Sequence, residues 1–196
     1  REPIAYILEE KEFWSKNFLV NKNTLIPRPE TELMVEKIVK IFEKKKIYIL
    51  DIGTGTGCIL LSLLSELKTS KGIGIDISKK AIEIAQSNSK KHGLNHRTKF
   101  FRRSLSEIYQ NKFDLIVSNP PYIRKKDIKN LNEDIKKFEP KLALDGGNDG
   151  LDVIKKVIYK SKSILKINGT LAIEIGNEQF SKVSKILRSN KFKTRY

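Results

Sequence analysis

The sequence predicts an α/β fold built on a mostly parallel, doubly wound sheet with helices on its faces. Short buried runs rich in β-branched residues alternate with stretches that have the period of amphipathic helices. The runs at 47–50, 72–76 and 113–117 end at a glycine turn, an acidic residue and a pair of prolines, respectively. Ligands of open α/β sheets bind at the carboxyl ends of the strands, so we expect the functional residues there.

The bulk composition limits the class of protein. A chain of 196 residues is long enough for one α/β domain with a sizeable core. Its single cysteine, Cys58, excludes an internal disulfide framework and predicts a reducing, cytoplasmic compartment. No apolar run approaches the roughly 20 residues of a membrane span, so no membrane partner is expected. His92 and His96 have no cysteine or carboxylate cluster beside them, and we predict no metal site.

The net charge of +16 raises the question of an anionic partner. Residues 151–196 carry 11 Lys+Arg against 3 Asp+Glu, which is half of that excess. The lysines are spread through a chain also rich in isoleucine and asparagine, and solvated helix faces account for them slightly better than a binding surface. Direct binding to nucleic acid therefore stays open but is not favoured.

The first 32 residues combine aromatic residues, prolines and charges. Phe13, Trp14 and Phe18 favour a short hairpin or lid that packs on the domain. Arg28 then stands between two prolines that stiffen the backbone. Thr31 is the expected N-cap of a helix that runs to about residue 43. The segment is either a simple helix start or a rigid flap closing one side of a site, and the sequence supports both.

The next two units resemble a nucleotide-binding fold in their local order. The strand at 47–50 leads into a glycine-rich turn and then a helix at 58–67, where glycine lets a ligand approach the backbone. The second strand ends in Asp76, 25 residues after Asp51. That offset is close to the roughly 20 residues at which such folds place a ribose-binding carboxylate. The helix that follows is expected to start at Ser78 as N-cap and to end at Gly93.

The run 113–117 is the predicted central strand, and its end carries the most specific motif. Pro120 pushes Asn119 out of helical space, so Asn119 and Tyr122 are presented at the carboxyl edge. The Asn119 side chain and the Pro120 carbonyl offer two acceptors for a planar –NH2 group, and Tyr122 offers a flat face for stacking. Taken alone, these residues are equally compatible with a Pro-Pro turn and a capping asparagine.

The rest of the chain supplies further elements of an α/β sheet. The lysine-rich segment 124–141 is expected to be partly helical and to form a substrate loop. The glycine-rich stretch 139–151 is either a flexible loop or a functional one. The remaining predictions are a strand at 98–102, a loop or short helix at 104–107, a helix closing at 168–169, a strand at 170–176, a helix at 178–189 and the start of a strand at 192–196.

The order of these motifs resembles the class I S-adenosylmethionine-dependent methyltransferases, which have a Rossmann-like fold. A dehydrogenase is disfavoured because its third glycine would fall at Cys58. The resemblance implies that Asp76 binds the ribose of S-adenosyl-L-methionine, that Leu105 covers the adenine and that Asn119 also contacts the cofactor. Ser104 departs from the acid usual there, so a backbone group or water is expected to replace it. The floor under the methionine part would be Gly53, Thr54, Gly55, Thr56 and Gly57.

Five stretches narrow the resemblance to the release-factor glutamine methyltransferase family: 1–7, 12–14, 25–32, 118–123 and 139–150. Pro-Arg-Pro-Glu at 27–30 favours this family over its ribosomal-protein relative, which usually carries Pro-Arg-Ser-Pro. The resemblance implies methylation of the glutamine N5 atom in the Gly-Gly-Gln loop of peptide chain release factors, with S-adenosyl-L-homocysteine as product. It also divides the chain into a linker, hairpin and flap at 1–32 and a catalytic domain at 33–196, without the family's N-terminal helical domain and last strands.

The family resemblance assigns roles to the central motif. Asn119, Pro120 and Tyr122 would be catalytic by positioning the amide without a strong base, and Pro121 and Arg28 would help to bind the substrate. A monomer is expected, although no motif fixes the oligomeric state. The alternatives are a nucleic-acid N-methyltransferase acting on adenine or guanine amino groups, a ribosomal-protein glutamine methyltransferase, and a fragment that binds the cofactor without activity.

Overall fold

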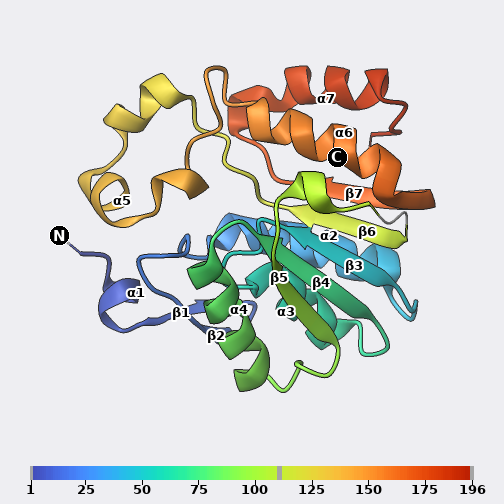
Figure 1. Cartoon of the computed structure of the whole chain (residues 1–196), viewed down its shortest axis with the longest axis horizontal. Coiled ribbons are helices and arrows are strands. Elements are labelled where there is room, and N and C mark those ends of the chain that lie inside the picture. Colours follow the sequence, from blue (N-terminus) through green and yellow to red (C-terminus); the bar gives the residue numbers. More distant parts are fainter. Residues whose placement is uncertain (1, 110–111, 195–196) are drawn as a thin grey trace.

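The centre of the molecule is a five-stranded parallel sheet in the order β5-β4-β3-β6-β7 (Figure 1). The computed structural model describes residues 2–109 and 112–194. From β3 the chain first builds the sheet outward on one side and then returns to build it on the other, so a topological switch point lies between β3 and β6. The predicted doubly wound sheet is confirmed. Its strands are β3 (Tyr48–Ile52), β4 (Lys71–Asp76), β5 (Thr98–Arg102), β6 (Phe113–Ser118) and β7 (Leu165–Ile173).

Helices cover both faces of this sheet (Figure 1). Side chains of a strand alternate between its faces, so Ile49 packs into one apolar cluster and its neighbour Leu50 into another. The first cluster is shared with α2 (Glu32–Phe42), α3 (Cys58–Glu66) and α4 (Lys79–Lys91). The opposite face is covered by α6 (Asp152–Ile164) and α7 (Phe180–Ser189). Burial on both faces explains why the strands are nearly continuous apolar runs.

The predicted N-terminal hairpin is confirmed. After α1 (Ile4–Ile7), strands β1 (Glu10–Phe13) and β2 (Lys16–Leu19) pair antiparallel through a turn at residues 14–15, both with positive φ. Phe13 and Phe18 are buried in the main core cluster. Asn88 of α4 accepts from the Leu19 amide at 2.7 Å and donates to the Leu19 carbonyl at 3.0 Å, which fixes the hairpin on the domain. The division of the chain at residue 32 stays a prediction.

Two predictions near the carboxyl end are wrong. Helix α6 ends at Ile164, and β7 starts at the next residue rather than at Thr170. Phe113 pairs with Leu165 while Leu115 pairs with Thr170, so residues 166–169 form an irregularity inside the strand, with φ +62° at Asn168. The Asn-Gly pair that predicted a helix end serves this bulge instead. Residues 192–194 form no strand, and residues 195–196 of that prediction lie outside the described part.

The segment between β6 and α6 has little regular structure. It contains 3-10 turns at Lys125–Asn130 and Lys141–Ala143 and the short helix α5 (Glu133–Phe138), which confirms the partly helical prediction. Further 3-10 turns lie at Pro29–Thr31, Leu105–Glu107 and Asn177–Gln179. None of the helices in residues 2–109 and 112–194 has the length and apolar character needed to cross a membrane.

Candidate active site

The glycine turn after β3 lies against the end of β4. The amides of Gly53 and Thr54 both donate to the Ile75 carbonyl, at 2.9 and 3.0 Å. Gly53, Gly55 and Gly57 all have positive φ, between +53° and +80°, a conformation that disfavours other residues. A side chain at Gly57 would also meet Leu61 at 3.2 Å. Most amides of the turn are thus engaged within the protein, and the lack of side chains at Gly53 and Gly55 leaves open space beside the turn at the carboxyl edge of the sheet.

Asp76 joins this turn to the start of α4. Its Oδ2 accepts from the Gly55 amide at 3.1 Å, and its Oδ1 accepts from the Ser78 amide at 2.9 Å. Burial raises the pKa of Asp76, while these backbone hydrogen bonds lower it. Ser78 accepts from the Ala81 amide, and Gly93 follows the helix end with φ +66°, so both predicted helix ends are confirmed. The carboxylate stands where the sequence predicted a ribose ligand.

Asp51 is the second-to-last residue of β3, and its side chain is fully buried. Its Oδ2 accepts a hydrogen bond from Thr54 Oγ1 at 2.7 Å, whereas its buried Oδ1 has no partner. Burial raises the pKa of Asp51 to about 7, and the nearby Asp76 carboxylate adds to the increase. A buried carboxylate oxygen without a partner suits a cationic group of a ligand. The sequence prediction used Asp51 only as part of a motif and did not single out its unpartnered oxygen.

Leu105 and Ser104 lie beyond β5. Leu105 is half-buried and packs against the cluster that contains Ile75. The Ser104 amide donates to Glu107 Oε2 at 2.7 Å, and the Ser104 hydroxyl is hydrogen-bonded to the Ser106 hydroxyl. The Ser104 amide thus caps the 3-10 turn and its hydroxyl pairs with Ser106, and the group that contacts the adenine stays a prediction.

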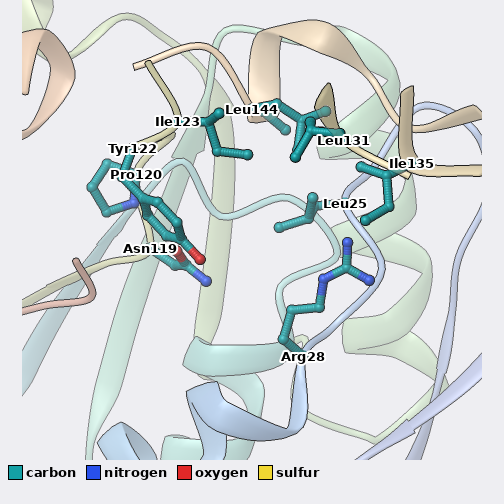
Figure 2. A pocket seen from close by; sticks show the side chains of 10 residues that line it. Leu25, Arg28, Asn119, Pro120, Tyr122, Ile123, Leu131, Ile135 and Leu144 are labelled. Carbon is teal, nitrogen blue, oxygen red and sulfur yellow. The ribbon is translucent and has the colours of Figure 1, made fainter. Parts of the chain in front are cut away.

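A cavity of about 190 Å³ opens beside Asn119 (Figure 2). Figure 2 shows Asn119, Pro120 and Tyr122 on one side of it and Leu25 and Arg28 on the other. The structure thus brings the predicted flap and the predicted catalytic motif to one cavity, while Pro121 is not part of its lining. The lining residues are Leu25, Arg28, Asn119, Pro120, Tyr122, Ile123, Leu131, Ile135, Ala143 and Leu144.

An ion pair ties the flap to the segment that follows α5. Arg28 Nη2 lies 2.6 Å from Glu139 Oε1, and only 1% of the Glu139 side chain is exposed against 31% of Arg28. Burial raises the pKa of Glu139, and Arg28 lowers it. Glu139 Oε2 is buried without a hydrogen-bond partner. The sequence prediction contained both residues and did not pair them.

The second glycine-rich stretch packs behind the motif and is not a free loop. A side chain at Gly146 would lie 2.8 Å from the Pro121 carbonyl and from Tyr122 Cα. Gln179 Nε2 donates to the carbonyls of Tyr122 and Gly150, at 2.9 and 3.1 Å. This packing fixes the backbone on both sides of Tyr122. Burial raises the pKa of the Tyr122 hydroxyl, and the nearby Glu174 carboxylate adds to that effect.

Thr31 stands at the N-cap position of α2, as the sequence predicted, but its side chain makes no capping hydrogen bond, because its hydroxyl is used elsewhere. Thr31 Oγ1 donates to Glu174 Oε2 at 2.7 Å and accepts from Asn119 Nδ2 at 3.2 Å. Burial raises the pKa of Glu174, while the hydrogen bonds from Thr31 and Asn119 lower it. The sequence prediction missed Glu174, although an acidic residue inside an apolar strand was a signal for it.

The arrangement offers no metal-binding cluster within residues 2–109 and 112–194, where no group of three or more His, Cys, Asp or Glu side chains gathers. Instead it places a glycine turn and two carboxylates on one side of the switch point, and a pocket with paired acceptors on the other. This combination suits a ligand with a ribose and a cationic part beside a substrate with a planar –NH2 group.

Comparison with known proteins agrees with this geometry. The family described as "Methyltransferase domain" matches residues 43–194. A solved structure of the hMettl16 catalytic domain is similar at a TM-score of 0.71, with 16% identity over 88% of this chain and 66% of that one. A ribosomal protein L11 methylase from Lactobacillus delbrueckii subsp. bulgaricus is similar at 0.61, with 19% identity over 86% of this chain and 74% of that one. The fold and the site thus define a methyltransferase domain.

Sequence relatives narrow this class. The release factor glutamine methyltransferase of Buchnera aphidicola is 44% identical over 97% of this chain and 68% of its own length. That of Caulobacter vibrioides is 40% identical over 96% of this chain and 66% of its own length. The chain belongs to the release factor glutamine methyltransferase family. It spans about two thirds of the length of these relatives, 64% for the one from Bradyrhizobium diazoefficiens.

Proposed function

We propose that this chain transfers the methyl group of S-adenosylmethionine to the side-chain amide nitrogen of the glutamine in the Gly-Gly-Gln motif of peptide chain release factors. The observation that carries the proposal is the cavity at the carboxyl end of β6. Asn119 and Pro120 line it together with the ring of Tyr122. Family membership supports the choice of a glutamine, because the named relatives are release factor glutamine methyltransferases.

The residues on the cofactor side fit S-adenosylmethionine. The backbone of Gly53–Gly57 would lie under its methionine part, and Asp76 would accept hydrogen bonds from the ribose hydroxyls. Leu105 would contact the adenine. The unpartnered Oδ1 of buried Asp51 is suited to the positive charge near the amino-acid part. When bound, the cofactor supplies an electrophilic methyl group on a positively charged sulfur.

The substrate side has to orient a poor nucleophile. The lone pair of an amide nitrogen is delocalised into its carbonyl, so the nitrogen gains most from being held in the right direction. Asn119 Oδ1 and the Pro120 carbonyl would accept its two N–H bonds, and the Tyr122 ring would fix the amide plane. Positioning of this kind can lower a barrier by roughly 7–11 kcal/mol. No strong base is needed, since the proton can pass to solvent after transfer.

The flap would close the other side of the cavity. Arg28 lines it and is held by Glu139, so its remaining N–H groups are suited to donate to a carbonyl oxygen of the substrate loop. The apolar residues Leu25, Leu131 and Ile135 would exclude water from the amide. Pro121 would support the backbone of the motif. The proposal also includes a monomeric state and a cytoplasmic location.

The proposal is tested with labelled S-adenosylmethionine and a purified release factor, beside the factor with Gln→Ala in its Gly-Gly-Gln motif and beside bulk tRNA and rRNA. The expected result is label on the unmodified factor alone. Label on RNA would favour the alternative of a nucleic-acid N-methyltransferase, for which steep salt dependence is expected. Label on neither would contradict the proposal for this chain.

A further inference from the structure

The hydrogen bonds around Asn119 determine which end of its side-chain amide faces the cavity. We propose that Thr31 and Glu174 are positioning residues that hold Asn119 with its oxygen, not its nitrogen, toward the substrate. The inference rests on the proposed function, because it assigns two more residues to the site that would hold the glutamine amide.

The direction of the hydrogen bonds follows from the inventory of donors. An ionised carboxylate only accepts, so the single hydroxyl proton of Thr31 is committed to Glu174 Oε2, at 2.7 Å. Thr31 Oγ1 can then only accept from its other neighbour. The group at 3.2 Å from it is Nδ2 of Asn119, which donates. Glu174 thus fixes the Thr31 hydroxyl as an acceptor toward Asn119. The Asn119 side chain also donates to Glu174 directly, so both residues hold the nitrogen end of the Asn119 amide.

The consequence for the substrate is specific. With Nδ2 engaged by Thr31, Oδ1 is the atom of the Asn119 amide that remains to accept from a substrate –NH2 group. If the amide were turned over, Oδ1 would face the lone pairs of Thr31 Oγ1, and Nδ2 would meet the substrate –NH2 as donor against donor. A mismatch of this kind leaves polar groups unpaired and costs about 1–3 kcal/mol for each buried group, so the orientation matters for binding in a productive geometry.

The positions of both residues are firmly held. Thr31 is 2% exposed. The Glu174 amide donates to the Ser118 carbonyl at 3.0 Å, and the Ser118 hydroxyl donates to the Ile52 carbonyl at 2.8 Å. The backbone of Glu174 is therefore hydrogen-bonded to Ser118, the residue that precedes Asn119. Thr31 comes from the other direction, at the end of the proline-bracketed flap, so the flap contributes to the orientation of Asn119 as well as to the cavity wall.

The test compares variants that keep or remove the hydroxyl. Thr31→Val keeps the shape and removes the donor and acceptor, whereas Thr31→Ser retains them. We expect Thr31→Val to lower kcat for release factor methylation by about 10- to 100-fold and Thr31→Ser to recover most of it. Glu174→Gln should lower kcat in the same direction, because its amide can donate to Thr31 and free the hydroxyl to turn toward Asn119. The Kd for S-adenosylmethionine should stay within about threefold in all of them.

Two controls separate positioning from general structure. Thr98→Val makes the same hydroxyl-to-methyl change at a buried site in β5, where Thr98 is hydrogen-bonded to Ser89. It should leave kcat unchanged. In the background of Asn119→Ala, Thr31→Val should cause no further loss, because its effect passes through Asn119. Side-chain amide proton exchange of Asn119, measured by NMR in the free protein, should be faster in Thr31→Val than in the wild type.

The outcomes distinguish this inference from the proposed function. If Asn119→Ala keeps near-normal turnover, the proposed function fails, and this inference fails with it. If Asn119→Ala is inactive while Thr31→Val and Glu174→Gln keep wild-type kcat and slow amide exchange, the positioning role alone is wrong. Equal losses from Thr31→Val in the wild-type and Asn119→Ala backgrounds would also contradict it. Loss of fold in Thr31→Val would appear in a thermal melt, and Glu174→Gln then decides the question.

Discussion

The two halves of the site are assembled in different ways. Apart from Leu105, the cofactor half lies within one β-α-β unit, and its contacts are local: Asp51 with Thr54, and Asp76 with Gly55, 21 residues away. The substrate half joins segments that are far apart in the sequence. Arg28 meets Glu139 across 111 residues, and Thr31 meets Glu174 across 143.

This difference teaches which half depends on the rest of the fold. Local turns and strand ends are set by short sequence motifs and by glycine conformations that only a few residues can adopt. The pocket around Asn119 needs the flap, β6, β7 and the segment before α6 to be in place together. We therefore expect changes in the cofactor half to act on ligand affinity, and changes in the substrate half to act on turnover and on stability.

The largest effect should come from Asn119→Ala. Removing one of two acceptors for the amide should reduce kcat by about 10²–10³-fold, the usual range for one lost group that orients or stabilises a reacting centre. The affinity for S-adenosylmethionine should change by less than about tenfold, as determined by calorimetry. A large loss of affinity with normal kcat at saturation would assign Asn119 to the cofactor half instead.

Asp76→Ala should give the reverse pattern. Under the proposed function, loss of the carboxylate would remove two charge-assisted hydrogen bonds to the ribose, so the Kd for S-adenosylmethionine should rise by roughly 10²-fold. At saturating cofactor, kcat should stay near that of the wild type. A variant with unchanged Kd and low kcat would break the proposed division between the two halves.

Arg28→Ala tests the ion pair that links the flap to Glu139. It leaves Glu139 buried without its cation, and we expect the free energy of unfolding to fall by about 1–3 kcal/mol, less than for a fully buried pair because 31% of Arg28 is exposed. The double variant with Glu139→Gln should be more stable than Arg28→Ala alone. Urea denaturation measures both. Equal stabilities would mean that the pair is not coupled in solution.

The smallest expected effect is the change in thermal stability with pH that Asp51 causes. Burial raises its pKa to about 7, above that of an unfolded chain, so the folded state binds the proton more tightly. Its contribution to stability is full below the unfolded pKa and is lost as pH rises through about 7. The ligand-free wild type should therefore melt at a lower temperature at pH 8.5 than at pH 5.5.

Asp51→Asn is the matched variant for that prediction. It should melt at a higher temperature than the wild type at pH 8.5, because it has no buried carboxyl group to ionise, and it should show less dependence on pH in this range. Its affinity for S-adenosylmethionine should fall, because the carboxylate that suits the cationic part is gone. A pH dependence identical to that of the wild type would show that another group is responsible.

The difference between local contacts in the cofactor half and long-range contacts in the substrate half explains which features could be predicted from the sequence. The glycine turn, Asp76 and the Asn119 motif could be predicted, because each is a short motif at a strand end. The pairing of Glu139 with Arg28 and of Glu174 with Thr31 could not, because nothing in a sequence states which distant residues will face each other. The partners of the Thr31 hydroxyl were missed for a related reason. Threonine before a helix is a good N-cap, and the stronger demand of a buried carboxylate overrides that local preference.

The most direct test of the central claim is a crystal structure of the chain with S-adenosyl-L-homocysteine and a peptide containing Gly-Gly-Gln. The account predicts that the glutamine amide nitrogen lies 2.7–3.2 Å, the usual range for such hydrogen bonds, from both Asn119 Oδ1 and the Pro120 carbonyl oxygen, with Asn119 Nδ2 still donating to Thr31. A glutamine bound outside this cavity, or an Asn119 amide turned with its nitrogen toward the peptide, would contradict it.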